Sequence, residues 1–133
     1  MNLETIRQYI TSHLHTWDQS NTTKVIYDNR HANDIDTTLP FVKLNTNFGN
    51  AQTVSIDSGP KRRRTGTVTL QCFAPKNTGL KNLTLIVDDL VSHFEYNRST
   101  NRKVWFGTSD VINVANDSFY QINININFQA SDI

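Results

Sequence analysis

The chain has 133 residues, a length that suits one domain able to bury a core without disulfides or metal ions. Its 13 basic and 12 acidic residues give a net charge of +1, which favours neither a nucleic-acid binder nor an acidic-surface protein. The single cysteine excludes an intramolecular disulfide and a cysteine-based zinc site, and no apolar run approaches the roughly 18 residues of a membrane span, so we expect no membrane association.

The first third of the chain predicts a helix followed by strands. Asn2 is in place to cap a helix whose apolar residues recur at spacings of three and four, namely Leu3, Ile6, Ile10, Leu14 and Trp17. Residues 25–27 predict a short strand after a polar break, and residues 41–48 predict another strand after Pro40. A loop or hairpin is expected after Gly49, with a separate brief strand around Val54 and Ile56.

The middle of the chain predicts a strand and the main packing helix. In residues 66–74 apolar and polar side chains alternate, and Cys72 lies in phase with Val68 and Leu70, which indicates a small core residue rather than a nucleophile. The helix is expected after Gly79, and its apolar stripe consists of Leu80, Leu83, Val87, Leu90 and Phe94.

The last third predicts strands near residues 104–106 and 111–114, a turn at Asn116 and Asp117, and a final strand over residues 119–130. The order of helix, strands, helix and strands is typical of an α+β protein. We therefore expect a single domain over residues 1–133, with a mostly antiparallel sheet and both amphipathic helices packed on one face.

The final strand is the most regular segment of the chain. Its apolar positions are Tyr120, Ile122, Ile124, Ile126, Phe128 and Ala130, and its polar positions are Gln121, Asn123, Asn125, Asn127 and Gln129. Because successive side chains of a strand point to opposite faces, one face is expected in the core and the other carries only amides. Exposed strands are normally guarded by charged residues. Two interpretations are open: a solvent face in an Asn-rich protein, or a face that meets another subunit.

A basic run is the one charged cluster that departs from the background. Lys61, Arg62, Arg63 and Arg64 follow a Gly-Pro turn and precede a strand, so the run is expected at a projecting hairpin or loop tip. Three roles are open: a solvated loop, a contact with acidic groups of a neighbouring subunit, or phosphate binding. Four cations without interleaved aromatic residues are a weak nucleic-acid signature.

Candidate catalytic groups do not assemble by spacing. His13 and His15 lie two apart on the expected helix and point about 200° apart, so they cannot share a metal ion. Asp89 and His93 are four apart and are expected to form at most a helix-surface pair, since no oxyanion-donating glycine accompanies them. The glycines form no phosphate-binding motif. We expect no catalytic, cofactor-binding or metal-binding residues, and no enzyme activity.

The order of these features resembles the tail terminator, or tail completion, proteins of long-tailed bacteriophages. The stretches that carry the resemblance run along nearly the whole chain: the opening helix ending on Trp17, Tyr27-Asp28-Asn29, Pro40-Phe41-Val42-Lys43-Leu44, Arg64-Thr65-Gly66, Phe73-Ala74-Pro75, Gly79 before the second helix, and Phe119-Tyr120-Gln121-Ile122-Asn123-Ile124. Each is a turn or strand signature, and their order and spacing carry the weight.

The resemblance implies a structural role in the virion. Such proteins form a ring, typically of six subunits, on the head-proximal end of the tail tube. They stop tube polymerisation and present a docking surface for the head connector, while DNA passes through the lumen. The expected partners are therefore further copies of the chain, the tube protein, the connector, and DNA bound without sequence specificity. The expected location is the tail of the virion, and the host cytoplasm during assembly.

Two other classes of function remain open at this point. Another head-tail joining or tail tube component would share the α+β architecture and the lack of chemistry. A small nucleic-acid-binding module would instead use the basic run, and its DNA affinity would depend strongly on salt.

Overall fold

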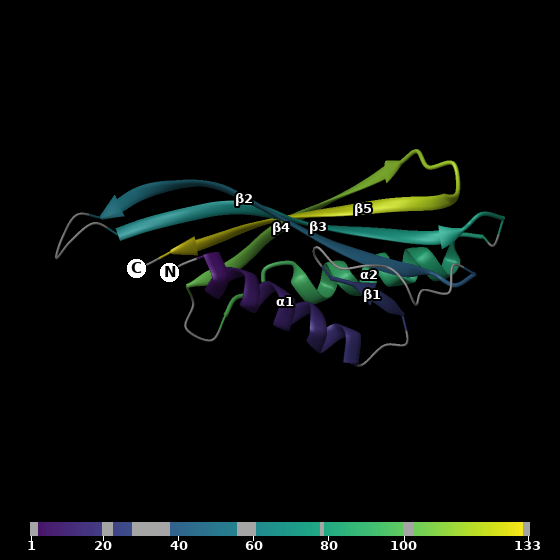
Figure 1. Ribbon diagram of the computed structural model, residues 1–133, viewed down its shortest axis with the longest axis horizontal. Coiled ribbons are helices and arrows are strands. Elements are labelled where there is room, and N and C mark those ends of the chain that lie inside the picture. The colour runs from purple at the N-terminus through teal and green to yellow at the C-terminus, as the bar shows by residue number, and fades with distance from the viewer. Residues whose placement is uncertain are drawn as a thin grey trace.

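The computed structural model describes residues 3–19, 23–27, 38–55, 61–77, 79–99 and 103–131. These residues form two helices and one five-stranded sheet (Figure 1). In chain order the elements are α1 (Leu3–Gln19), β1 (Lys24–Ile26), β2 (Phe41–Ser55), β3 (Lys61–Pro75), α2 (Lys81–Phe94), β4 (Val104–Val114) and β5 (Phe119–Ser131).

The strands lie in the order β1-β2-β3-β5-β4, and every neighbouring pair is antiparallel except β1 with β2. Both helices lie on the same side of this sheet (Figure 1). The predicted α+β architecture, with a mostly antiparallel sheet and two helices on one face, is therefore confirmed.

The core lies between the helices and the sheet. It contains most of the predicted apolar residues of both helices and of the strands, and its largest fully buried side chains include Ile6, Ile10, Leu14, Leu83, Leu90, Phe94, Leu44, Leu70, Ile124, Ile126 and Phe128. Cys72 is fully buried among them, as its phase predicts. Tyr120, predicted on the core face of the final strand, is 36% exposed. The buried stripes begin later than predicted, because Leu3, the first residue of α1, and Leu80, which precedes α2, remain 44% and 45% exposed.

The predicted loop after Gly49 and the separate strand around Val54 are wrong, because β2 runs unbroken through this region. Ile56 lies outside the described residues. The register between β2 and β3 shifts between Phe48 and Ala51, so the strand accommodates the glycine as a β-bulge and continues. Gly49 also passes so close to the backbone of Thr65 that a Cβ there would clash with it.

The two strands predicted near residues 104–106 and 111–114 are one strand, β4. Here too a register shift, between Phe106 and Ser109, replaces the predicted break. The Glu95 carboxylate accepts a hydrogen bond from the backbone N–H of Ser109 at 3.1 Å, which provides a partner for a donor at the irregular position. In both strands, polar and small residues mark a bulge rather than a loop.

Two histidines link the helices. The Nε2 atom of His13 donates to the carbonyl oxygen of His93 at 2.7 Å, and the Nε2 atom of His93 donates to the carbonyl oxygen of His13 at 2.6 Å. Each Nε2 must carry a proton, because a carbonyl oxygen only accepts. The imidazole rings stack with centroids 4.1 Å apart. The spacing allowed at most a helix-surface pair of Asp89 and His93, and in the structure His93 turns toward α1 instead.

The α2 stripe provides the first test of this packing. Replacing Val87 or Leu90 with Asp should lower the free energy of unfolding by about 3 kcal/mol or more, because each change buries an unpaired charge. Leu85 on the same helix is 54% exposed, so Leu85→Asp is the matched control and should have little effect. Chemical denaturation of the three variants measures the difference. Parent-like unfolding of Val87→Asp and Leu90→Asp would contradict the packing.

The histidine pair predicts a pH dependence of stability. Burial lowers the pKa of His13; a charge on His93 lowers it further, and the hydrogen bond to the His93 carbonyl opposes these effects. The unfolded chain therefore binds the proton more readily than the folded chain, and stability falls as the pH drops below about 6.5. Melting temperatures at pH 7.5 and 5.5 should differ less in His13→Gln, whose amide still donates but does not titrate. An equal or larger drop in the variant would contradict this role.

Candidate functional site

The sheet has one face that no described element covers (Figure 1). We call it the open face. Residues opposite each other in neighbouring antiparallel strands point to the same side, so the registers identify its members. They include Lys43, Asn45 and Asn47 of β2, Thr67, Thr69 and Gln71 of β3, Asn123, Asn125 and Asn127 of β5, and Asp110 and Ile112 of β4.

The amides of β5 lie in the middle of the open face, on the side opposite the core as their alternation predicts. Asn125 accepts a hydrogen bond from the Thr69 hydroxyl at 2.9 Å, and Asn123 accepts one from Gln121 at 2.8 Å. Asn127 is exposed. A primary amide has two N–H donors and a carbonyl oxygen with two lone pairs, so these contacts use only part of its hydrogen-bonding capacity. The open face therefore has hydrogen-bonding groups available for a polar partner.

Three phenylalanines from three strands meet at one end of the open face. The ring of Phe41 stacks on that of Phe73 with centroids 4.8 Å apart, and the ring of Phe119 packs edge-on against both, at 5.3 and 5.8 Å. The sequence alone did not predict this cluster. The sequence does show that Phe41 alternates in phase with Lys43 and Asn45, which indicates that its ring lies on the polar face. Only the strand registers show that the three rings meet.

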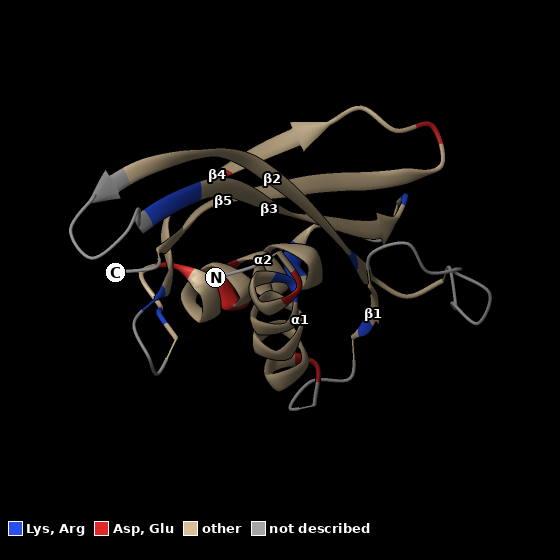
Figure 2. Cartoon of the chain, turned by 60° about the vertical axis from the view of Figure 1, so that its left-hand side comes forward, with Lys and Arg blue, Asp and Glu red and all other residues tan. Residues whose placement is uncertain are grey.

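Of the two predicted placements of the basic run, a projecting hairpin or a loop tip, the structure supports strand pairing, because Lys61, Arg62, Arg63 and Arg64 open β3 and pair with β2 (Figure 2). The strand begins five residues before the predicted Gly66 because the β2–β3 ladder continues beyond the bulge in β2. Beyond Arg63, β5 no longer pairs with β3, so this end of the sheet is a two-stranded hairpin.

The arginines of this run differ in their contacts. Arg64 donates to the carbonyl oxygen of Gly49 at 3.0 Å, across the bulge in β2. The guanidinium of Arg63 lies over the ring of Trp105, 5.7 Å from its centroid, and the Nε of Arg63 is buried without a hydrogen-bond partner in the described part of the chain. Arg62 is exposed. Arg63 and Arg64 thus contribute to the sheet itself, and Arg62 presents its charge to the surroundings.

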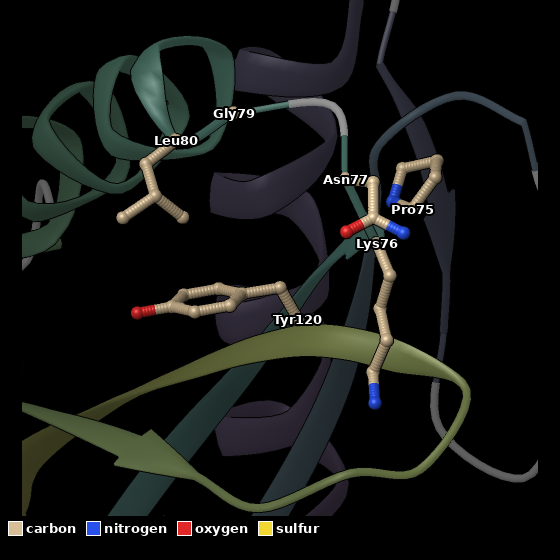
Figure 3. Close-up of a pocket in the computed structure, with 6 residues that line it drawn as sticks. All are labelled: Pro75, Lys76, Asn77, Gly79, Leu80 and Tyr120. Atoms are coloured by element: carbon tan, nitrogen blue, oxygen red, sulfur yellow. The ribbon is translucent and has the colours of Figure 1, made fainter.

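A recess lies at the opposite end of β3, where the strand leads into α2 (Figure 3). It is lined by Pro75, Lys76, Asn77, Gly79, Leu80 and Tyr120. Gly79 turns the chain there with a φ of 81°, a conformation that side chains disfavour. Leu80 and Tyr120 provide an apolar wall, and Lys76 is the one ionisable group besides the tyrosine. This composition suits contact with an apolar segment rather than chemistry on a substrate.

The described residues offer no assembled reaction centre. Among them, no group of three His, Cys, Asp or Glu side chains is arranged to hold a metal ion. Burial raises the pKa of the Cys72 thiol to about 12, so it is not a nucleophilic thiolate at neutral pH. The helices in the described ranges are too short or too polar to span a bilayer. Surfaces, rather than a catalytic pocket, are the notable features of this molecule.

Comparison with known proteins identifies the fold and the family of this chain. A solved structure superposes with a TM-score of 0.73 at 16% sequence identity, covering 98% of this chain and 96% of that chain. At this identity the likeness shows the fold alone. No curated protein matches. The family model described as "Phage tail terminator protein" matches residues 5–128, which include both helices and most of the sheet, and the chain therefore belongs to the phage tail terminator family.

Proposed function

We propose that this protein forms a ring, of six subunits, on the head-proximal end of the phage tail tube. There it ends tube polymerisation and provides the surface on which the head connector docks. Membership in the tail terminator family supports a structural role in tail completion. The single observation that carries this proposal is the open face: an uncovered sheet on which β3 from Thr65 to Gln71 and β5 from Asn123 to Gln129 present hydroxyls and amides but no charged side chain.

The composition of the open face fits a contact that forms during assembly. It is too polar for an obligate interface, which resembles a protein core cut in half. Its amides have free hydrogen-bonding capacity, and the Phe41, Phe73 and Phe119 rings at one end provide the aromatic contacts that carry binding energy in many interfaces. Such a face is hydrated in a free subunit and pairs with another virion component, with Asn123, Asn125 and Asn127 at its centre.

The basic start of β3 has a separate role in the proposal. Four neighbouring cations repel one another, and exposed charges gain little from pairing in water. Their clustering is best explained by acidic groups or phosphates that approach in the assembled particle. Of the four residues in this run, Lys61, Arg62, Arg63 and Arg64, the exposed Arg62 would make this contact. DNA that passes through the lumen would meet such charges without sequence-specific binding.

No step of this function requires catalysis, a cofactor or a metal ion. The protein acts through association, in the host cytoplasm while tails are built and at the head-proximal end of the tail in the finished virion. Self-association is weak for the free chain and firm on the tube end, because the tube supplies the template that orders the subunits.

Phage particles assembled without this protein test the function directly. Electron microscopy should show overlong tails or tails that are not joined to heads, and supplying the protein in trans should restore normal particles. If its absence leaves tail length and head joining unchanged, the protein is not the terminator of that tail.

Asn125→Lys tests the open face. The side chain points away from the core, so the melting temperature should stay close to that of the parent, while occupancy of purified tube ends should fall several-fold because a charge is placed in the contact. Asn82→Lys, an identical change at an exposed position of α2, is the control and should bind as the parent does. Co-sedimentation with tubes measures both. Equal binding by the two variants would remove the open face from the contact.

A further inference from the structure

Both sides of the sheet end in strands whose outer edges are largely unpaired in the described part of the chain. On one side, β1 pairs only with residues Phe41, Val42 and Lys43 of β2, and the rest of that strand has β3 alone as a partner. On the other side, β4 has β5 as its only long partner. Unpaired backbone groups at a sheet edge are a template for a further strand.

The outer edge of β4 is divided into a covered half and an open half. Phe106 donates its N–H to Asn97, and Val104 accepts a hydrogen bond from Ser99, so residues 96–99 cover the first half. The N–H of Ser109 is bound by Glu95. Beyond Ser109, the alternation of hydrogen bonds in an antiparallel strand directs the N–H groups of residues 111 and 113 away from β5.

The side chains along the open half of β4 are unusual for an edge strand exposed to water. Val111 is 53% exposed and Ile112 is 47% exposed, on opposite faces of the sheet. Edge strands usually carry lysine or proline to prevent pairing, and Asp110 is the one charged residue of β4. The open half therefore has both the unpaired backbone groups and the apolar side chains that a neighbouring strand would cover.

Charge is distributed unequally between the two sides of the sheet. The charged residues of β1, β2 and β3 are all basic: Lys24, Lys43, Lys61, Arg62, Arg63 and Arg64. The hairpin of β4 and β5 has only the acidic Asp110 and Asp117 (Figure 2). Arg98 and Lys103 lie next to the covered half of β4 and leave the open half acidic. Two β4 edges would bring the Asp110 carboxylates of two copies together, whereas residues 44–50 of β2 carry no charge, so the charges favour pairing of unlike edges.

The strand directions also match. β2 and β5 run one way, and β3 and β4 run the other way. A copy placed beside β4 in the same orientation presents β2, which runs antiparallel to β4. Residues 111–114 of β4 and residues 45–48 of β2 lie in the regular parts of these edges, and they can align with Ile112 opposite Asn47, both on the open face.

We propose that subunits of the ring join edge to edge, with residues 111–114 of β4 pairing antiparallel with residues 45–48 of β2 in the next copy. This inference rests on the proposed ring and names the contact that closes it. Because the contact uses two different edges, a pair of joined copies still has one free edge of each kind, and repetition with rotation gives a closed ring. The sheets then form a continuous band, and the open face stays available for the tube or the lumen.

Crosslinking between engineered cysteines tests the contact. Ile112→Cys places a thiol beside the open edge of β4, and Asn47→Cys places one beside the open edge of β2, both on the open face. Cys72 is fully buried and does not compete. The full chain is assembled on purified tail tubes and treated with a short bis-maleimide. A mixture of the two single variants should give crosslinked dimers, and each variant alone should give none.

The double variant, with both cysteines in one chain, should give a ladder of crosslinked species that ends at the ring size. Asn127→Cys is the matched control, because Asn127 lies in the same row as Asn47 but two strands further in, and it should not crosslink to itself. Dimers of Ile112→Cys alone would show pairing between two β4 edges and overturn the proposal. Dimers of Asn127→Cys alone would move the contact to the open face and also overturn it.

Failure of the ring function gives a different result from failure of the edge contact. If the unmodified chain does not co-sediment with tubes, the proposed function fails, and the same crosslinking is read at high protein concentration in solution. If the cysteine variants co-sediment with tubes but the mixture gives no crosslinked dimer, the ring function stands and the edge contact is wrong. Absence of mixed dimers in both settings overturns the edge contact.

Discussion

The structure depends on the burial of two helical stripes against one face of a single sheet. The α1 stripe with Ile6, Ile10 and Leu14 and the α2 stripe with Leu83 and Leu90 have no other apolar surface to cover them, so both helices occupy the same side. That side receives most of the apolar positions of the long strands. Period-two alternation then places the remaining positions on the other side, which is mainly polar apart from Ile112 and a few aromatic rings.

The unbroken ladder between β3 and β5 keeps the strands of the sheet in register. It runs from Arg63 opposite Ser131 to Pro75 opposite Phe119 without a shift, while β2 and β4 on either side each contain a bulge. Gly66 lies in this ladder where Phe128 and the Asn47 carbonyl approach closely, and a Cβ would clash with both. A regular centre with bulged flanks lets the sheet twist and curve around the helices while the central register stays intact.

Within the described residues, several potentially reactive side chains are used in packing: Cys72 is in the core, and His13 and His93 join the helices through each other's carbonyl oxygens. The features of the described chain that suit association are the open face, the basic start of β3 and two sheet edges that differ in charge. Under the proposed function, two unlike edges give each contact between copies a defined direction.

Much of this could be predicted from the sequence, because it depends on local periodicity. Spacings of three and four located both helices, and strict alternation assigned Val68, Leu70, Cys72 and the β5 isoleucines to the core and the β5 amides to the other face. The bulges in β2 and β4 were misinterpreted as breaks, because a glycine or a polar pair looks the same in a loop and in a bulge until a partner strand is present. Only the tertiary structure shows the Phe41, Phe73 and Phe119 cluster and the histidine pair. It also shows that Arg63 and Arg64 make contacts within the sheet, while Arg62 is exposed. Each of these joins residues that are distant in the chain or depends on a neighbouring strand, and it is register and helix packing, not local pattern, that determine which side chains meet.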